Sequence, residues 1–427
     1  MPITLLPFII AFLISLIAVP TIIKVAYSKR LLDDPSRESR KVHRYSVPNL
    51  GGVAVFSTFA LVSCLFIHGD MLAKANFILA AGIIIFTVGL KDDLLALDPY
   101  KKFAAQFFTA FIVVYFADIR FTNFFGVMGI EEIGPILSYT FTSFVIVFVI
   151  NAFNLIDGIN GLLGSITLLV SLIYGTLFYL MDEKGLCVLS FSMAGSVLGF
   201  LKYNLRKRAH IFMGDAGAYS IGFILAILSI KFVELNQATT HHTQPIINAA
   251  PGVAIALLIM PVFDTFRVFT LRILRGRSPF MADRNHLHHR LLDLGLNHLQ
   301  ASSIILATNI SVILLAIGIH QQVQTSELLV ILTLTMLFFN MLLWIYEVRN
   351  ADKIQAIKFR RTPAVPKEGP LATATLEKTK NTTIDSSLPE VQTLAAKEYF
   401  GINNPNDTEA AKRFTQEVLD NLEKSKN

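Results

Sequence analysis

The stretch ITLLPFIIAFLISLIAVPTIIKV, residues 3–25, decides the fold. Its side chains are almost all apolar up to Lys24, and about 20 such residues in a helix span the roughly 30 Å hydrocarbon core of a bilayer. No basic segment precedes this run and no small-residue cleavage site ends it. We therefore expect a retained membrane span and not a cleaved signal peptide.

Apolar runs of similar length recur along the chain as far as residue 346. Hydrophobic residues make up 53% of the 427 residues, charged residues 16%, and the mean hydropathy is +0.56, an apolar excess too large for a soluble protein to bury. The sequence thus predicts an all-α integral membrane protein. About eleven transmembrane helices are expected, at residues 3–25, 50–67, 75–90, 103–117, 135–152, 161–180, 186–202, 217–232, 248–271, 302–319 and 328–346.

Lysines and arginines are sorted between alternate connections. Basic clusters follow the first, third, seventh and ninth predicted spans, whereas the connections between these are nearly free of them. Because positive loops stay cytoplasmic, the N-terminus should lie outside and the C-terminus inside. The net charge of +6 therefore reflects membrane topology, and we expect no nucleic acid partner.

Composition divides the chain near residue 349. Residues 1–349 form the predicted polytopic transmembrane domain, and residues 350–427 form a polar cytoplasmic tail with three prolines near its start. We expect the tail to be largely flexible, with one short amphipathic helix over 410–424. Cys64 and Cys187 lie in or beside apolar runs, which is typical of small buried hydrophobes.

Carboxylates, amides and histidines gather in four clusters in the cytoplasmic connections. These clusters are KDD at 91–93, NAFNLIDG at 151–158, MGDAG at 213–217 and HLHH at 286–289. Acidic residues at span ends in apolar surroundings are costly, which indicates function. Asp92 and Asp93 are adjacent and point about 100° apart on a helix, so we expect separate roles. The alternative for this pair is a solvated helix end.

Two of these clusters have a functional and a structural interpretation. Asn154 and Asp157 are three residues apart and share a helix face, where an amide and a carboxylate suit a nucleoside or a hydrated cation. Asp157 could instead cap the following span. Asp215 follows Gly214 in front of a span, where it could bind a metal or act as a helix cap.

The histidine cluster suits either a transition metal or an anionic phosphate. His286 and His289 have helical spacing, which metal binding would use. We favour phosphate, because five arginines lie between residues 272 and 290 and no soft ligand accompanies the histidines. Carboxylates for Mg²⁺ beside basic groups for phosphate oxygens indicate a phosphoryl-transfer site. Its place at the inner surface suggests a nucleotide donor and a lipid acceptor.

Six blocks in this order resemble the polyprenyl-phosphate N-acetylhexosamine-1-phosphate transferase family. The blocks are VPNLGG at 47–52, GLKDD at 89–93, NAFNLIDGINGL at 151–162, FMGDAGA at 212–218, PVFDT at 261–265 and RGRSPFMADRNHLHHRLLDLG at 275–295. The last block is similar to the bacterial branch that makes lipid-linked GlcNAc. It is less similar to the peptidoglycan branch, whose corresponding loop carries consecutive histidines, because Leu287 interrupts the histidines here.

The resemblance implies transfer of an N-acetylhexosamine 1-phosphate, with GlcNAc as the expected sugar, from a UDP-sugar to undecaprenyl phosphate. UMP is released, and the product carries the first sugar of a cell-surface glycan such as O-antigen or a cell-wall polymer. This places the chain in the bacterial inner membrane with a cytoplasmic active site, and it leaves a homodimer open.

On this basis we assign roles to particular residues. We expect Mg²⁺, with Mn²⁺ as a substitute, on Asp215 and Asp157. The expected catalytic residues are Asp92, Asp93 and Asp215. The expected substrate-binding residues are Lys41, His43, Asn151, Asn154, Asp157, Arg272, His286, His288 and His289.

Two other membrane protein classes share some of these features. A secondary transporter would place its ionisable groups near the bilayer midplane, whereas these clusters fall at span ends. A CDP-alcohol phosphotransferase also begins its signature with Asp-Gly, but it needs further aspartates along the same helix, and residues 161–180 contain none.

Overall fold

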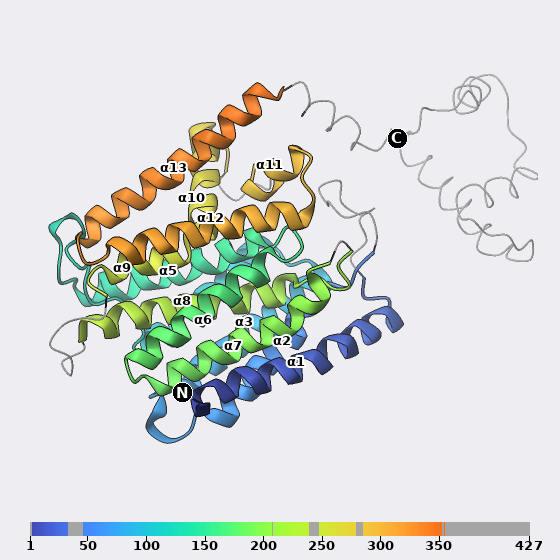
Figure 1. The fold of residues 1–427 in the computed structure, drawn as a ribbon. Coiled ribbons are helices and arrows are strands. Elements are labelled where there is room, and N and C mark those ends of the chain that lie inside the picture. The colour runs from blue at the N-terminus through green and yellow to red at the C-terminus, as the bar shows by residue number, and fades with distance from the viewer. Residues whose placement is uncertain are drawn as a thin grey trace, which may run out of the picture. The chain divides into compact units, whose positions relative to one another are not determined.

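A computed structural model describes residues 2–32, 46–206, 208–238, 247–278, 285–351 and 354 (Figure 1). Apart from isolated β-bridges such as Asn123 to Glu132, the regular structure of these residues is helical. The predicted site residues Lys41 and His43 lie outside the described residues, as does nearly all of the predicted tail.

The helices follow one another along the chain. Their bounds are α1 Pro2–Ser28, α2 Gly51–Phe66, η2 Gly69–Met71, α3 Ala75–Leu95, α4 Pro99–Phe111, η3 Ile112–Phe116, η4 Val127–Gly129, α5 Pro135–Ile156, α6 Leu162–Leu180, α7 Lys184–Asn204, α8 Gly214–Ala238, α9 Ala250–Leu257, α10 Ile259–Leu274, α11 Leu287–Asp293, α12 His298–Ile319 and α13 Thr325–Arg349.

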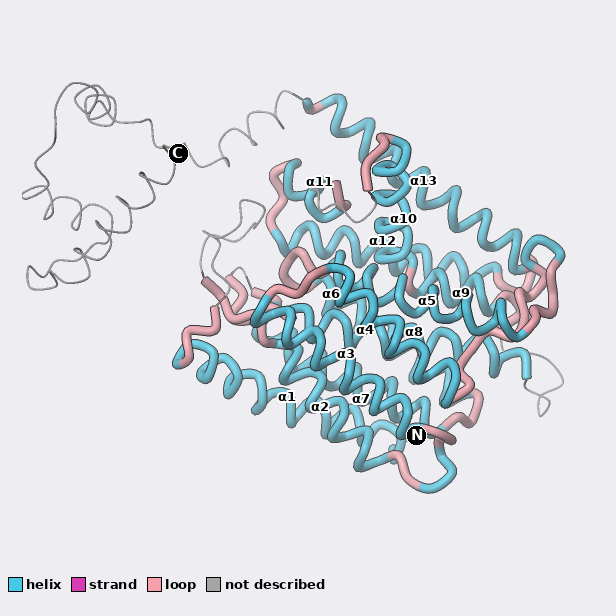
Figure 2. Tube along the Cα trace, turned by 180° about the vertical axis from the view of Figure 1, so that it is seen from behind, coloured by secondary structure: helices cyan, strands magenta, loops and turns pink. Residues whose placement is uncertain are grey.

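Each predicted span coincides with helical structure, and length and composition select seven helices able to cross a membrane. These are α1, α5, α6, α7, α8, α12 and α13. The predicted span over 248–271 is broken into two helices, because α9 and α10 meet at a bend of 80°. Pro261 lies in the first turn of α10, where a helix needs no backbone N–H donor. Both short helices lie beside α12 (Figures 1 and 2).

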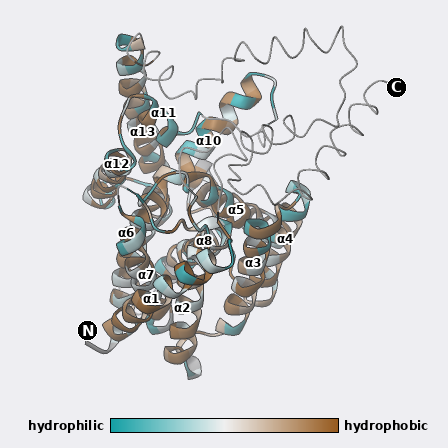
Figure 3. Ribbon diagram, turned by 90° about the vertical axis from the view of Figure 1, so that its right-hand side faces the viewer, coloured by the Kyte–Doolittle hydropathy of each residue, from teal (hydrophilic) through white to brown (hydrophobic). Residues whose placement is uncertain are grey.

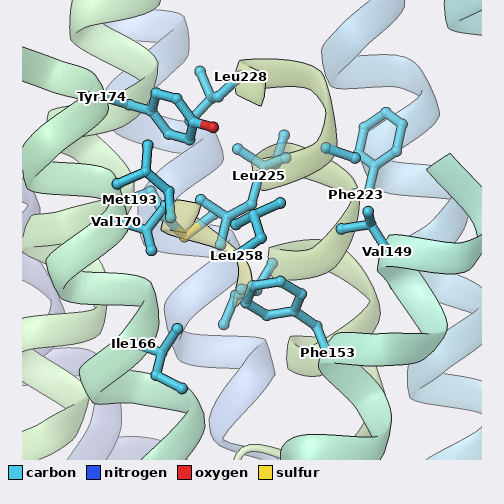
Figure 4. Close-up of a cluster of buried hydrophobic side chains, with 14 of the residues drawn as sticks. Val149, Phe153, Ile166, Val170, Tyr174, Met193, Phe223, Leu225, Leu228 and Leu258 are labelled. Atoms are coloured by element: carbon cyan, nitrogen blue, oxygen red, sulfur yellow. The ribbon is translucent and has the colours of Figure 1, made fainter. Parts of the chain in front are cut away.

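The helix α8 lies at the centre of the described helices. In its most apolar stretch of 18 residues, 94% of the residues are buried. The helix packs against α2, α3, α5, α6 and α9. Phe153 of α5, Met193 of α7 and Phe223 of α8 are among the side chains that fill this core (Figure 4). A membrane helix buried on all sides can place the residues of its first turn among several neighbours, which is where the predicted Asp215 lies.

The outer helices expose apolar side chains. In the most apolar 18-residue stretches of α1 and α13, only 22% and 17% of the residues are buried. Apolar residues run along α1, α2 and α3 in Figure 3. Side chains such as Ile17, which is 72% exposed, would be unfavourable in water over so large a surface. In a bilayer they contact lipid, as expected for a multi-pass membrane protein.

Glycines allow α2 and α3 to approach the backbone at the start of α8. A Cβ atom at Gly89 would lie 2.6 Å from Ala216 Cα, and one at Gly52 would lie 2.1 Å from Gly217 N. These contacts are to main-chain atoms, which cannot move aside as a side chain can. The close approach brings the end of α3 to the first turn of α8.

Gly89→Ala should therefore force α3 and α8 apart and destabilise the protein. We expect a cost of about 1–3 kcal/mol, typical of overpacking, seen as a lower melting temperature in detergent. Gly318→Ala in α12 is the matched control, since nothing lies within 4 Å of its added Cβ. Equal melting temperatures for the two variants would contradict the close packing.

Candidate active site

Three of the predicted clusters meet where α3 and α5 end and α8 begins. Asp92 and Asp93 lie in the last turn of α3, Asn154 lies in the last turn of α5, and Asp157 directly follows α5. Asp215 is the second residue of α8. Because α3 and α5 both pack on α8, their chain ends bring these side chains together.

Asp93 holds the start of α8. Its Oδ1 accepts from the backbone N of Asp215 at 2.9 Å and from Asn49 Nδ2 at 3.1 Å, and its Oδ2 accepts from the backbone N of Ala216 at 2.9 Å. The first amides of a helix lack partners within that helix and favour a negative charge. The carboxylate of Asp93 thus fixes the position of Asp215.

Asp92 has different partners, as the helical angle between the two residues predicts. Its Oδ2 pairs with Lys102 Nζ at 2.5 Å and accepts from Tyr219 Oη at 3.0 Å, and its Oδ1 accepts from the backbone N of Leu97 at 2.8 Å. The residue is only 7% exposed. Because the carboxylate of Asp92 is buried and paired, the alternative that Asp92 lies at a solvated helix end is excluded.

Asp215 meets side chains from both neighbouring helices. Its Oδ1 accepts from Asn154 Nδ2 at 2.7 Å, and its carboxyl group interacts directly with that of Asp92. Asp93, and not Asp215, receives the first amides of α8. The interpretation of Asp215 as a mere helix cap is therefore excluded.

Asp157 adds a further carboxylate to this cluster. It does not cap α6, because the residue before that helix is Gly161. Burial, followed by the charge of Asp215, raises the pKa of Asp157 to about 7. The charge of Asp215 thus opposes that of Asp157 and that of Asp92, an arrangement that a bound cation would stabilise.

The oxygen donors of this cluster suit Mg²⁺. Among the described residues, no group of three or more His, Cys, Asp or Glu side chains forms a complete metal cage. Mg²⁺ does not need one, because it binds through one or two carboxylates and completes its shell with water and substrate phosphate. The carboxylates of Asp157 and Asp215 are of the kind that could hold this ion, and a bound ion would offset their negative charge.

Asn151 lies one turn before this cluster and joins two helices. Its Nδ2 donates to Gln106 Oε1 of α4 at 2.6 Å and to the backbone O of Val147 at 2.7 Å. Its amide is engaged within the protein, so its predicted contact with substrate would require an exchange of these hydrogen bonds.

The histidine segment packs against the Asp157 loop. His288 is 2% exposed, and a Cβ at Gly158 would lie 2.1 Å from its Nε2. Burial, followed by the neighbouring His289, lowers the pKa of His288 well below its usual range. This shift favours the uncharged imidazole, and the binding of substrate by His288 stays a prediction.

His286 and Arg272 are also buried, at 4% and 5% exposure. The Nδ1 atom of His286 lies 2.9 Å from Asp264 Oδ2, and the Arg272 guanidinium lies 5.8 Å from the ring centre of Phe269. The rings of His288 and His289 are tilted by 45° to each other, with ring centres 4.2 Å apart. The structure thus gathers the predicted histidines on α11 and just before it.

Sequence reasoning missed several residues of this region. Lys102, Tyr219, Asn49 and Gln106 contact predicted site residues, and Asp264 contacts His286. Lys102 belongs to the basic cluster after the third predicted span, where its charge indicates topology and not catalysis. Asp264 carried the clearest signal, a carboxylate inside an apolar run and three residues before Arg267.

Comparison with known proteins supports the family resemblance that these motifs carry. A model of the family described as "Glycosyl transferase family 4" matches residues 75–233, a range that contains Asp92, Asp93, Asn154, Asp157 and Asp215.

Curated relatives match most of the chain. An undecaprenyl-phosphate alpha-N-acetylglucosaminyl 1-phosphate transferase of Escherichia coli is 28% identical over 78% of this chain and 87% of that protein. The protein of the same name from Yersinia pestis is 30% identical, with the same coverage. A probable undecaprenyl-phosphate N-acetylglucosaminyl 1-phosphate transferase of Bacillus subtilis is 32% identical over 68% of this chain and 78% of its own.

Proposed function

Because the chain belongs to the glycosyl transferase family 4 of polyprenyl-phosphate N-acetylhexosamine-1-phosphate transferases, we propose that it transfers GlcNAc-1-phosphate from UDP-GlcNAc to undecaprenyl phosphate. The observation that carries this proposal is the convergence of Asp92, Asp157 and Asp215 from three helices. The printed names of the relatives supply the acceptor and the sugar.

The reaction exchanges one phosphoanhydride for another. An oxygen of the acceptor phosphate forms a bond to the β-phosphorus of the UDP-sugar, and the bond from that phosphorus to the oxygen bridging to the α-phosphate breaks. UMP leaves, and the sugar remains on a lipid diphosphate. Positioning and charge stabilisation supply most of the catalysis in such transfers.

The carboxylate cluster would bind the donor diphosphate through Mg²⁺, with Mn²⁺ as a substitute. Asp157 and Asp215 would be the protein ligands, and Asn154 would hold Asp215 in place through its 2.7 Å hydrogen bond. When bound, the cation supplies positive charge that offsets the negative charge gathered on the transferring phosphoryl group.

Asp92 and Asp93 would have separate roles. The oxygens of Asp93 already accept from the first amides of α8, so Asp93 would position Asp215. Asp92 pairs with Lys102, whose side chain is 27% exposed and able to meet a phosphate. A phosphate monoester is largely ionised near neutral pH, so we assign Asp92 to orienting the acceptor and not to removing a proton.

The proposed function is tested with the purified chain in detergent. We expect UMP release only when a UDP-sugar and undecaprenyl phosphate are both present. A panel of UDP-GlcNAc, UDP-GalNAc and a 6-deoxy sugar nucleotide identifies the donor, and we expect UDP-GlcNAc to react fastest. UMP release that does not depend on the lipid would contradict the proposal, and the identity of the fastest donor decides the sugar.

We also propose that the chain crosses the bilayer about eleven times, with its N-terminus outside. The sorting of basic residues supports this orientation. Two single cysteine substitutions in a Cys64→Ser background test it. Tyr100→Cys would face the cytoplasm, and Asp182→Cys would face the outside. Both positions are more than four-fifths exposed. On right-side-out spheroplasts, a membrane-impermeant thiol reagent should label Asp182→Cys alone. The reverse labelling would overturn the orientation.

A further inference from the structure

Asp264 is a buried carboxylate with no part in the proposed function so far. It lies in α10 and is 5% exposed. Its Oδ1 accepts from Arg267 Nη2 at 2.8 Å, and its Oδ2 lies 2.9 Å from His286 Nδ1. The backbone N of Leu287 lies 3.1 Å and 3.2 Å from its two oxygens. A buried charge is tolerated only when it is paired and hydrogen-bonded.

Arg267 extends this contact to a third position of the histidine segment. Its Nη2 also donates to the backbone O of Asn285 at 2.6 Å. The ion pair thus holds the carbonyl of Asn285, the ring of His286 and the amide of Leu287. Three successive residues of the segment are tied to one turn of α10.

The hydrogen bond from Asp264 fixes the orientation of the His286 ring. Since an ionised carboxylate only accepts hydrogen bonds, Nδ1 of His286 carries the proton, an assignment made from this contact. Nε2 is then the ring nitrogen left for a ligand: in the neutral ring it accepts from a sugar hydroxyl or amide, and in the protonated ring it donates to a phosphate oxygen. Carboxylates orient metal-bound and catalytic imidazoles in the same way.

Packed side chains connect the oriented ring of His286 to the loop that holds Asp157. His286 and His288 are parallel to within 10°, with ring centres 5.9 Å apart. His288 in turn contacts Gly158, the neighbour of Asp157. A chain of packed groups therefore joins Asp264 to the loop that holds a predicted metal ligand.

We infer that Asp264 and Arg267 form a positioning pair that aims His286 at the diphosphate-sugar part of the donor. This inference rests on the proposed function. Asp264 does not touch the donor itself, because both of its oxygens receive protein donors. Its effect passes through His286, which distinguishes it from a residue that only stabilises the fold.

A double-mutant cycle of Asp264→Asn and His286→Ala tests this pathway. In the otherwise wild-type chain, Asp264→Asn should lower kcat/KM for UDP-GlcNAc about 10- to 100-fold, whereas the KM for undecaprenyl phosphate should stay unchanged. In the His286→Ala background, the same substitution should change kcat/KM by less than about twofold. The inference would be overturned if the losses of the two single variants multiplied in the double variant. It would also be overturned if Asp264→Asn raised the KM values for both substrates equally.

Two further variants keep the test decisive. Asp182→Asn is the matched control, because its side chain is 86% exposed and lies at the opposite ends of the spans; it should leave both KM values unchanged. If Asp264→Asn does not fold, Arg267→Gln takes its place in the cycle with the same expected dependence on His286, and an independent effect would overturn the inference.

The wild-type assay separates this inference from the proposed function. A wild-type chain that transfers no sugar phosphate overturns the proposed function together with the inference. An active wild type whose cycle shows no coupling between positions 264 and 286 overturns the inference alone.

Discussion

Asp215→Asn should abolish turnover, with a loss in kcat on the order of 10³-fold or more. The amide has the shape of the carboxylate and can still accept the hydrogen bond from Asn154 Nδ2. It lacks the negative charge that a metal ligand needs. The loss should therefore appear in catalysis and not in folding.

The stability of this variant gives an independent readout. Asp215 lies against the carboxyl group of Asp92 and near that of Asp157, and the substitution removes this repulsion. The melting temperature of Asp215→Asn in detergent should equal or exceed that of the wild type. Sites that bind ligands often lower the stability of the empty protein in this way.

Asp182→Asn is again the matched control, since it removes one carboxylate from an exposed position. It should leave both turnover and melting temperature unchanged. If Asp215→Asn retains a rate near that of the wild type, Asp215 is not a metal ligand and the proposed metal site is wrong.

Removal of divalent cations should stop turnover completely. Asp157 and Asp215 are the proposed ligands, and Mg²⁺ should restore the rate after EDTA treatment, with Mn²⁺ restoring part of it. EDTA saturated with Mg²⁺ beforehand serves as the control. Turnover that continues without metal would exclude the cation from the mechanism.

Binding of the cation can also be measured without turnover. A ligand that binds only the folded protein raises its stability by RT ln(1 + [L]/Kd), which is about 2.7 kcal/mol at 100 times Kd. Mg²⁺ should therefore raise the melting temperature of the wild type. It should raise that of Asp215→Asn much less, and equal shifts would place the ion elsewhere.

The helices could be predicted from the sequence, because a membrane span needs a long apolar run and little else. The break between α9 and α10 could not be predicted in the same way. Residues 248–271 form one apolar run, and the composition of that run is the same whether its helix is straight or bent by 80°.

The meeting of the carboxylates could also be predicted, because Asp92, Asp157 and Asp215 lie at span ends on one expected face. The burial of His288 could not, since it depends on how α11 packs against the loop after α5. The contact between Asp264 and His286 joins residues 22 positions apart. Such a contact depends on tertiary packing, which spacing along the chain does not reveal.

The enzyme transfers a sugar phosphate and not a sugar alone. This is measured by incubating UDP-GlcNAc labelled at its β-phosphate with undecaprenyl phosphate and Mg²⁺. We expect the label to move to the lipid while unlabelled UMP is released in equal amount. Label that stays with the nucleotide as UDP, with the sugar on a lipid monophosphate, would show cleavage at the sugar C1–O bond and would contradict it.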